Sequence, residues 1–332
     1  MDRITLAPVG FFRRIPLLPH QMQERWTPTE NVIVLCHLGV ARLDREAWSL
    51  TIDGLVARSI RLRFSDLTAY PKHTVSSFHQ CAGSPLQPFE PTRRICNVRW
   101  SGARLSDVLR DCEPAPQARY LWSYGADHGT FGDIEHPAYA KDLPLDRVPS
   151  DVLIAYELNG APLPPEHGFP ARLVVPGFYG TNSVKWLTRM TLAETRCAGA
   201  FTARWYNDPV FEADGRDCGK TAPVWAVAPE SVIVSPAPGE MLARDRPLEI
   251  WGWAWADGGI DTVDVSADGD GTWLPADVEA REDRAWQRFN AVWRPVESGT
   301  HVLCSRAVSG SGATQPLAGR RNAIHHVEVS VA

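Results

Sequence analysis

Hydrophobic and polar positions of the first 220 residues form short runs with the periods of strands and helices. Four runs predict strands: residues 48–53, 59–63, 152–156 and 171–175. Leu105, Val108 and Leu109 share one face of a helix predicted over residues 103–112, and Ser65 is the predicted N-cap of another short helix. No regular strand–helix repeat emerges. The pattern therefore predicts an α+β fold for this part.

From about Thr221 the chain changes to short alternating runs separated by glycine and aspartate turns. The runs predict strands at residues 231–235, 248–255, 262–266, 289–293, 301–307 and 326–331. Regularly spaced short strands are typical of an immunoglobulin-like β-sandwich of about 100 residues. We therefore predict two domains, residues 1–220 with an N-terminal arm over 1–30, and residues 221–332. Seven of the 13 tryptophans fall at or after Trp225, which indicates a surface that a partner covers.

Composition narrows the classes of partner. The 332-residue chain has a formal net charge of −5, which leaves no basic excess to neutralise nucleic acid or an anionic membrane. No apolar run approaches the roughly 20 residues of a membrane span. Arg13 and Arg14 resemble an export signal, but Pro16 and Pro19 interrupt the stretch after the two arginines. We expect a cytoplasmic protein that binds neither nucleic acid nor membrane.

Seven cysteines without a C-x-x-C spacing fit neither a disulfide framework nor a structural zinc site. Cys81 differs from the others because it follows an apolar, strand-forming run and precedes the small residues Ala82 and Gly83. On these residues alone it is a buried thiol, a nucleophile paired with His79, or a metal ligand.

A second cluster lies in the turns of residues 164–189. These turns carry the polar side chains His167, Arg172, Ser183 and Lys185. Such side chains, with backbone N–H groups, suit an anionic ligand, but an exposed loop with scattered charges would show the same pattern.

Several stretches match the motifs of one enzyme family in their order and spacing. They are C-A-G at 81–83, R-W-S-G-A-R-L-S-D-V-L at 99–109, A-Y-E-L-N-G-A-P-L-P-P-E-H-G-F-P-A-R-L-V-V-P-G at 155–177, V-K-W-L at 184–187 and N-A-I-H-H-V-E-V-S-V at 322–331. With these stretches the chain resembles the sulfite oxidase family of molybdenum-cofactor (molybdopterin) oxidoreductases, including the family's C-terminal dimerisation domain.

The resemblance implies a role for each match. Cys81 would be the single protein thiolate ligand of molybdenum, a soft ligand for a metal already bound to sulfur. The positions that would contact the molybdopterin are His37, Cys81, Asp127, His167, Arg172, Ser183, Val184 and Lys185. The family's chemistry is two-electron oxygen-atom transfer with a small-molecule substrate, and the electrons would leave to oxygen or to a separate carrier. The C-terminal domain would form a homodimer.

The chain departs from the family where substrate would bind. Leu35 stands where sulfite- and nitrate-active members carry an arginine, and Ser84, Pro85 and Leu86 replace an asparagine and basic residues. Tyr206 is the nearest counterpart of the active-site tyrosine, with Tyr179 as another candidate. We therefore expect a less cationic substrate pocket and a substrate other than sulfite.

Two other interpretations belong to different classes of protein. One is a catalytically inactive scaffold or binding protein that kept the fold, and the missing arginine motivates it. The other is a cysteine hydrolase that uses Cys81 and His79 without a metal.

Overall fold

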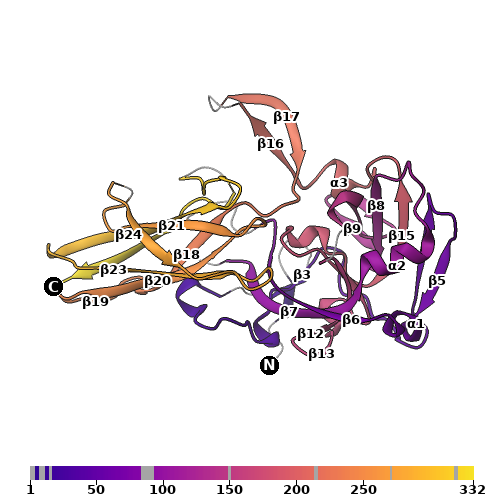
Figure 1. The fold of residues 1–332 in the computed structure, drawn as a ribbon, viewed down its shortest axis with the longest axis horizontal. Helices are drawn as coiled ribbons and strands as arrows, with labels where there is room; N and C mark the ends of the chain where they lie inside the picture. The colour runs from indigo at the N-terminus through magenta and orange to yellow at the C-terminus, as the bar shows by residue number, and fades with distance from the viewer. Residues whose placement is uncertain are drawn as a thin grey trace. The chain divides into compact units, whose positions relative to one another are not determined.

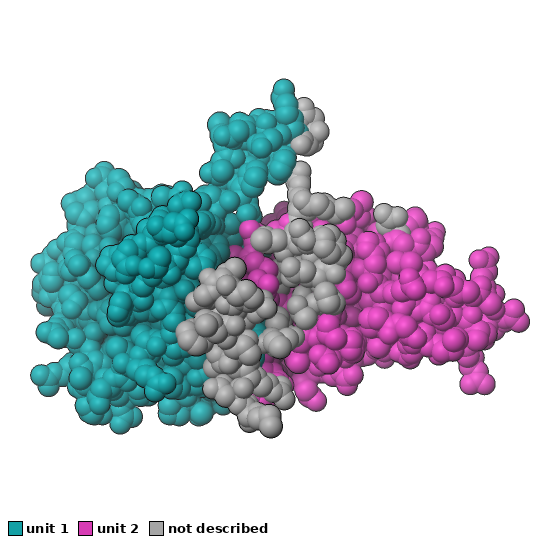
Figure 2. Space-filling model, turned by 180° about the vertical axis from the view of Figure 1, so that it is seen from behind, with its two compact units in different colours: residues 1–15, 33–75, 99–225 teal, residues 16–32, 76–98, 226–332 magenta. Residues whose placement is uncertain are grey.

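The computed structural model describes residues 4–6, 12–14, 17–83, 93–148, 151–212, 216–269, 271–317 and 321–332. The chain forms two compact units, shown in teal and magenta in Figure 2. Unit 1 comprises residues 1–15, 33–75 and 99–225, and unit 2 comprises residues 16–32, 76–98 and 226–332. Residues 76–98 are thus grouped with the C-terminal segment. The domains predicted from the sequence, 1–220 and 221–332, place the same residues in the first domain, and these bounds stay a prediction.

Unit 1 is built on a five-stranded sheet. Its order is β11 (Ala140–Pro144), β8 (Tyr120–Gly125), β15 (Leu187–Ala193), β4 (Ser49–Gly54) and β5 (Ile60–Arg63). Figure 1 labels β8, β15 and β5. Only β15 and β4 are parallel neighbours in this sheet. Leu50 and Ile52 alternate with polar residues in β4 and are fully buried, so the predicted strand at 48–53 is confirmed within one residue.

The second sheet of unit 1 centres on β12 (Leu153–Leu158). It pairs with β13 (Ala161–Pro162), β14 (Arg172–Val174) and residues 100–104 of β7 (Ile95–Arg104). The next strand in this sheet is β6 (Lys72–Gln80), and the boundary between the units falls inside β6 and inside β7. The predicted buried strands at 152–156 and 171–175 are confirmed as β12 and β14.

Three short α-helices lie in the described part of unit 1. They are α1 (Phe64–Ala69), α2 (Leu105–Cys112) and α3 (Ala200–Ala203). The face of α2 predicted from its sequence is buried in the core of the unit. The prediction of Ser65 as the N-cap of α1 is wrong. The helix begins at Phe64, because the side chain of Asp66 accepts a hydrogen bond from the backbone of Arg63 and fixes the start earlier.

The remaining elements of unit 1 are short. The strands are β1 (Ile4–Leu6), β2 (Phe12–Arg14), β3 (Leu35–Cys36), β9 (Gly129–Phe131), β10 (Ile134–His136), β16 (Asn207–Phe211) and β17 (Asp217–Pro223). The 3₁₀ helices are η3 (Leu145–Arg147), η4 (Pro165–His167) and η5 (Gly180–Asn182).

Unit 2 holds eight strands in one continuous order. They are β18 (Glu230–Ser235), β20 (Leu248–Trp255), β23 (Gln287–Trp293), β22 (Leu274–Val278), β21 (Ile260–Ser266), β24 (Gly299–Ser309), β25 (His326–Val331) and β19 (Met241–Leu242). The unit also holds the 3₁₀ helices η1 (Pro19–Gln21) and η2 (Thr29–Asn31). All six strands predicted after residue 221 are confirmed within about two residues, whereas β19 and β22 were not predicted.

Strands predominate over helices in the described ranges. None of the helices there combines the length and the apolar composition that a membrane crossing needs.

Candidate functional site

A cavity of about 1140 Å³ opens in unit 1 next to the segment that follows β3. It is lined by residues 38–43, 126–128, 165, 166 and 169. Its wall combines apolar side chains, such as those of Val40 and Phe169, with the charged side chains of Arg42 and Asp127. Pockets for small molecules and cofactors usually measure about 300–1,000 Å³, so this cavity has room for a ligand of several rings.

Asp127 presents a buried acceptor in the wall of this cavity. Its side chain is 6% exposed, and within the described ranges no donor bonds its Oδ1 atom. An added Cβ at Gly125 would lie 2.3 Å from Oδ1, so glycine at the end of β8 lets the carboxylate fold back. Burial raises the pKa of the Asp127 carboxyl to about 6, and the charge of Lys185 opposes this effect. Since buried polar atoms are normally hydrogen-bonded, the carboxylate suits an N–H donor on a ligand.

Lys185 joins three segments around the cavity. Its Nζ donates to the backbone carbonyl oxygens of Leu35 at 2.9 Å and Glu166 at 3.1 Å, and lies 2.9 Å from Sγ of Cys36. The ammonium also lies 4.4 Å from the ring centre of Trp186. The lysine thus holds β3 and η4 beside the turn that leads into β15.

Arg172 connects the turn at His167 to the turn at Ser183. Its side chain is 3% exposed, and it donates to the carbonyl oxygens of His167 at 3.1 Å and Ser183 at 2.9 Å. Gly168 has a φ of +104°, and a Cβ there would lie 3.0 Å from Cβ of Arg172 and 3.1 Å from Cβ of Lys185. The close approach of these chains requires glycine. In the described structure the guanidinium therefore shapes the loops around the cavity.

Ser183 and Val184 are buried in the same turn. The Ser183 hydroxyl accepts a hydrogen bond from the backbone N–H of Val175 at 3.0 Å, and the carbonyl of Val184 accepts one from Leu173 at 2.8 Å. The structure thus gathers His167, Ser183, Val184 and Lys185 in adjoining turns, with Arg172 at the start of β14 beside them, as their sequence cluster suggested.

His37 and Tyr206 form a second part of the site. The phenolic oxygen of Tyr206 lies 2.7 Å from Nε2 of His37. The rings of Phe131, Tyr139 and Phe201 also surround the imidazole, with centroids 4.9–6.1 Å away. Burial, followed by the charge of Lys185, lowers the pKa of His37 to about 3, so the imidazole is neutral at physiological pH.

Lys141 lies beside this pair, and the sequence analysis missed it. Its side chain is 1% exposed, its Nζ donates to the carbonyl oxygen of Phe201 at 2.9 Å, and it lies 5.4 Å from the ring centre of Tyr206. Burial lowers the pKa of this lysine to about 8. A signal existed in the sequence, because Lys141 and the core residue Leu143 are two apart in β11 and share a face.

Cys81 belongs to unit 2 and directly follows β6. Its backbone N–H donates to the carbonyl oxygen of Arg94 at 2.9 Å, and its Sγ accepts a hydrogen bond from the N–H of Gly83 at 3.4 Å. The thiol is 9% exposed. The prediction that Cys81 ends a strand is confirmed. Ser84, Pro85 and Leu86 lie outside the described residues.

Known proteins match this chain along most of its length. The family model of the oxidoreductase molybdopterin binding domain matches residues 37–201, and that of the Mo-co oxidoreductase dimerisation domain matches residues 222–328. The chain is 34% identical to the sulfite oxidase of Gallus gallus over 316 residues, which cover 87% of this chain and 68% of that protein. The chain belongs to the sulfite oxidase family of molybdenum-cofactor oxidoreductases.

The chain matches other known proteins with lower sequence identity. The mitochondrial sulfite oxidase of Rattus norvegicus is 32% identical, and the matched region spans only 57% of its length. The solved structure of the sulfane dehydrogenase SoxCD from Paracoccus pantotrophus aligns over 100% of this chain and 90% of that chain, with 28% identity and a TM-score of 0.79. The fold is thus of the sulfite oxidase type.

The match confirms two predictions from the motifs, membership of the sulfite oxidase family and the molybdenum–molybdopterin cofactor. The cavity at residues 38–43 fits such a group, because the buried Oδ1 atom of Asp127 can accept from the amino group of a pterin. Of the predicted site residues only Tyr206 falls between the two matched ranges.

Proposed function

We propose that this chain catalyses two-electron oxygen-atom transfer on a small molecule, with Cys81 as the only protein thiolate ligand of the molybdenum. The observation that carries the proposal is the buried carboxylate of Asp127 in the wall of the cavity of the molybdopterin-binding domain. Burial of an ionised carboxylate costs free energy. A ligand that donates a hydrogen bond to the carboxylate of Asp127 would offset this cost.

In this proposal the cofactor is held from several sides. Asp127 accepts hydrogen bonds from the pterin, while Lys185 and His167 face its anionic parts with the backbone of Ser183 and Val184. Arg172 acts as a positioning residue, because its hydrogen bonds fix the carbonyls of both turns. When bound, the molybdenum cofactor supplies the exchange of the oxygen atom and of two electrons.

The chain's own residues would then orient the substrate and control protons. Tyr206 is the proposed catalytic residue, and its hydroxyl is held by the neutral imidazole of His37 at 2.7 Å. A neutral imidazole can donate to or accept from this hydroxyl, depending on its tautomer. The pair is therefore suited to holding a proton at the phenolic oxygen.

The substrate is proposed to be a less charged or bulkier compound than sulfite. Leu35 occupies the family's arginine position, and its carbonyl oxygen is used by Lys185. Loss of one arginine–dianion pair typically costs a few kcal/mol of binding. The electrons are proposed to leave to oxygen or to a separate carrier.

For the C-terminal part we propose an immunoglobulin-like sandwich within an α+β protein, and a homodimer formed through it. The alternating strands of unit 2 and the match to the dimerisation domain at residues 222–328 support this. The inactive scaffold is not favoured, because both domains of an oxidoreductase family match this chain.

Metal analysis tests the proposal. The wild type and Cys81→Ser are expressed with molybdate in a host that makes the cofactor, with Cys96→Ser as a matched buried-cysteine control. We expect about one molybdenum per chain and a thiolate-to-metal absorption band in the wild type and in the control. The band should be lost in Cys81→Ser. Wild-type protein without molybdenum, or an unchanged band in Cys81→Ser, would overturn the proposal. Rapid turnover of micromolar sulfite would overturn only the substrate.

A further inference from the structure

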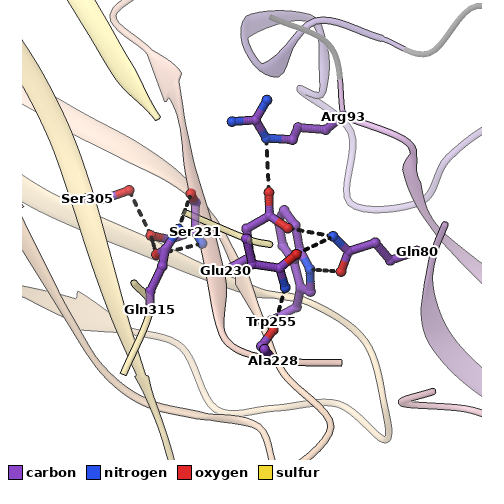
Figure 3. A network of polar contacts seen from close by, with 9 residues as sticks. Gln80, Arg93, Ala228, Glu230, Ser231, Trp255, Ser305 and Gln315 are labelled. Carbon is purple, nitrogen blue, oxygen red and sulfur yellow. Dashed lines mark hydrogen bonds and ion pairs between the residues drawn. The ribbon is translucent and has the colours of Figure 1, made fainter. Parts of the chain in front are cut away.

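The side chain of Gln80, the residue before Cys81, is fixed within unit 2. It is fully buried, and Figure 3 shows its polar contacts. Its Oε1 accepts from the indole N–H of Trp255 at 3.0 Å, and its Nε2 donates to Glu230 at 2.5 Å and to Asn322 at 3.2 Å. Both ends of the amide are therefore engaged by residues of the C-terminal segment. A side chain bonded in this way has a single orientation.

Glu230 also engages the other chain segment beside Cys81. Its Oε1 lies 2.9 Å from Nε of Arg93, and the two side chains are 0% and 1% exposed. Arg93 precedes Arg94, whose carbonyl oxygen accepts the backbone N–H of Cys81 at 2.9 Å. One carboxylate thus joins the two segments whose backbones meet at Cys81.

A buried ion pair of this kind needs an explanation, because apolar residues of similar size often give equal or higher stability. Glu230 lies at the start of β18, opposite Trp255 of β20, so its backbone is anchored in the strand order of unit 2. Because its backbone is fixed in these strands, the carboxylate of Glu230 can hold the side chains of Gln80 and Arg93 in place. Residues that orient a metal ligand from behind are a regular part of metal sites.

We propose that Glu230 is a positioning residue for Cys81, fixing the thiolate that ligates molybdenum by holding Gln80 and Arg93 on either side of it. The inference rests on the proposed function, in which Cys81 is that ligand. It adds residues of the C-terminal segment to the control of the metal centre.

The test compares two polar networks of unit 2 that Figure 3 shows together. Glu230→Gln removes the charge, and Gln80→Met removes the link to Glu230 while it leaves the pair of Arg93 and Glu230 intact. The matched control is Gln315→Met. The Oε1 of Gln315 accepts from Ser231 Oγ at 2.7 Å, within a separate buried network that also includes Ser305. All three variants are measured as holoenzymes for molybdenum content, thiolate-to-metal absorption and thermal midpoint.

We expect Glu230→Gln and Gln80→Met to bind molybdenum with a shifted and weakened absorption band, and to lose about 10-fold to 100-fold in activity. Gln315→Met should lower the thermal midpoint and leave the band unchanged. If Glu230→Gln does not fold, Gln80→Met decides the question alone.

An unchanged band in Gln80→Met, or an equal shift in Gln315→Met, would overturn the inference while the proposed function stands. Wild-type protein without molybdenum, or an unchanged band in Cys81→Ser, would overturn the proposed function and this inference with it.

Discussion

The hydroxyl of Tyr206 and the Nε2 atom of His37 are hydrogen-bonded at 2.7 Å, although they stand at opposite ends of unit 1 in the sequence. His37 directly follows β3, and Tyr206, with a φ of +56°, directly precedes β16. A positive φ at a bulky residue costs of order 1–3 kcal/mol, and active sites and ligand clamps are among the places where such strain is retained. The strained backbone of Tyr206 therefore agrees with its proposed catalytic role.

Tyr206→Phe should reduce turnover by about 100-fold and leave the molybdenum content unchanged, because only the hydroxyl is lost. Steady-state kinetics with metal analysis measure both quantities. Tyr139→Phe is the matched control, since its hydroxyl bonds the carbonyl oxygen of Thr181 at 2.9 Å and its ring also stacks near His37. Equal activities of the two variants would argue against a special role for Tyr206.

The stability of the protein should fall in acid partly through His37. Its pKa is lowered from 6.5 to about 3 in the folded chain, so the neutral ring is favoured by folding. This contribution is complete above pH 6.5 and is lost as the pH falls from about 6.5 to about 3. His37 contributes at most about 5 kcal/mol to the free energy of unfolding over this pH range. In urea unfolding, the free energy of unfolding should fall less steeply from pH 7 to pH 4 for His37→Gln than for the wild type. A wild-type slope in His37→Gln would refute the assignment.

Asp127→Asn should make the cofactor-free protein more stable and the holoenzyme poorer in cofactor. The pKa of Asp127 is raised from 3.8 to about 6, so its contribution to stability is present below pH 3.8 and is lost as the pH rises through about 6. At pH 8 the asparagine should therefore add up to about 3 kcal/mol to the free energy of unfolding. Urea unfolding at pH 8 and pH 4 and molybdenum analysis check both effects. Full molybdenum content in Asp127→Asn would mean that the carboxylate does not bind the cofactor.

The strands and the chemical motifs could be predicted from the sequence, because both depend on local patterns. The alternation in β4 and β25 buries one face whatever the remainder of the chain does. The turns at His167 and Ser183 carried their polar residues in one stretch, so their clustering needed no knowledge of tertiary structure.

Residues whose role depends on distant partners could not be predicted in this way. Glu230 stands in an apolar strand, and its partners Gln80 and Arg93 come from a segment far away in the chain. The contact of Arg172 with the cofactor stays a prediction, whereas its hydrogen bonds to backbone carbonyls depend on loops that only the fold brings together. The sequence could not predict these bonds, because the same residue type serves either purpose.

Arg172→Lys should destabilise the protein by about 2–4 kcal/mol, because a lysine cannot reach both carbonyl oxygens from one buried position. The loosened turns should also lower the molybdenum content. Arg189→Lys, at an exposed ion pair with Asp53, should cost less than about 1 kcal/mol. Unfolding in urea measures the stability loss of each variant and distinguishes Arg172→Lys from Arg189→Lys. Equal stability losses would show that the buried hydrogen bonds of Arg172 are dispensable.

Leu35→Arg tests the substrate proposal by restoring a cation two residues before His37. If the missing arginine explains a weak preference for sulfite, the new charge should lower KM for sulfite about 10-fold or more, because charge-assisted hydrogen bonds contribute about 1.5–3 kcal/mol. The molybdenum content should not change. Val292→Arg adds the same charge at a position that is 69% exposed in unit 2, and it should leave KM unchanged. A KM in Leu35→Arg that equals the wild-type value, at full molybdenum content, would mean that residue 35 does not control substrate charge.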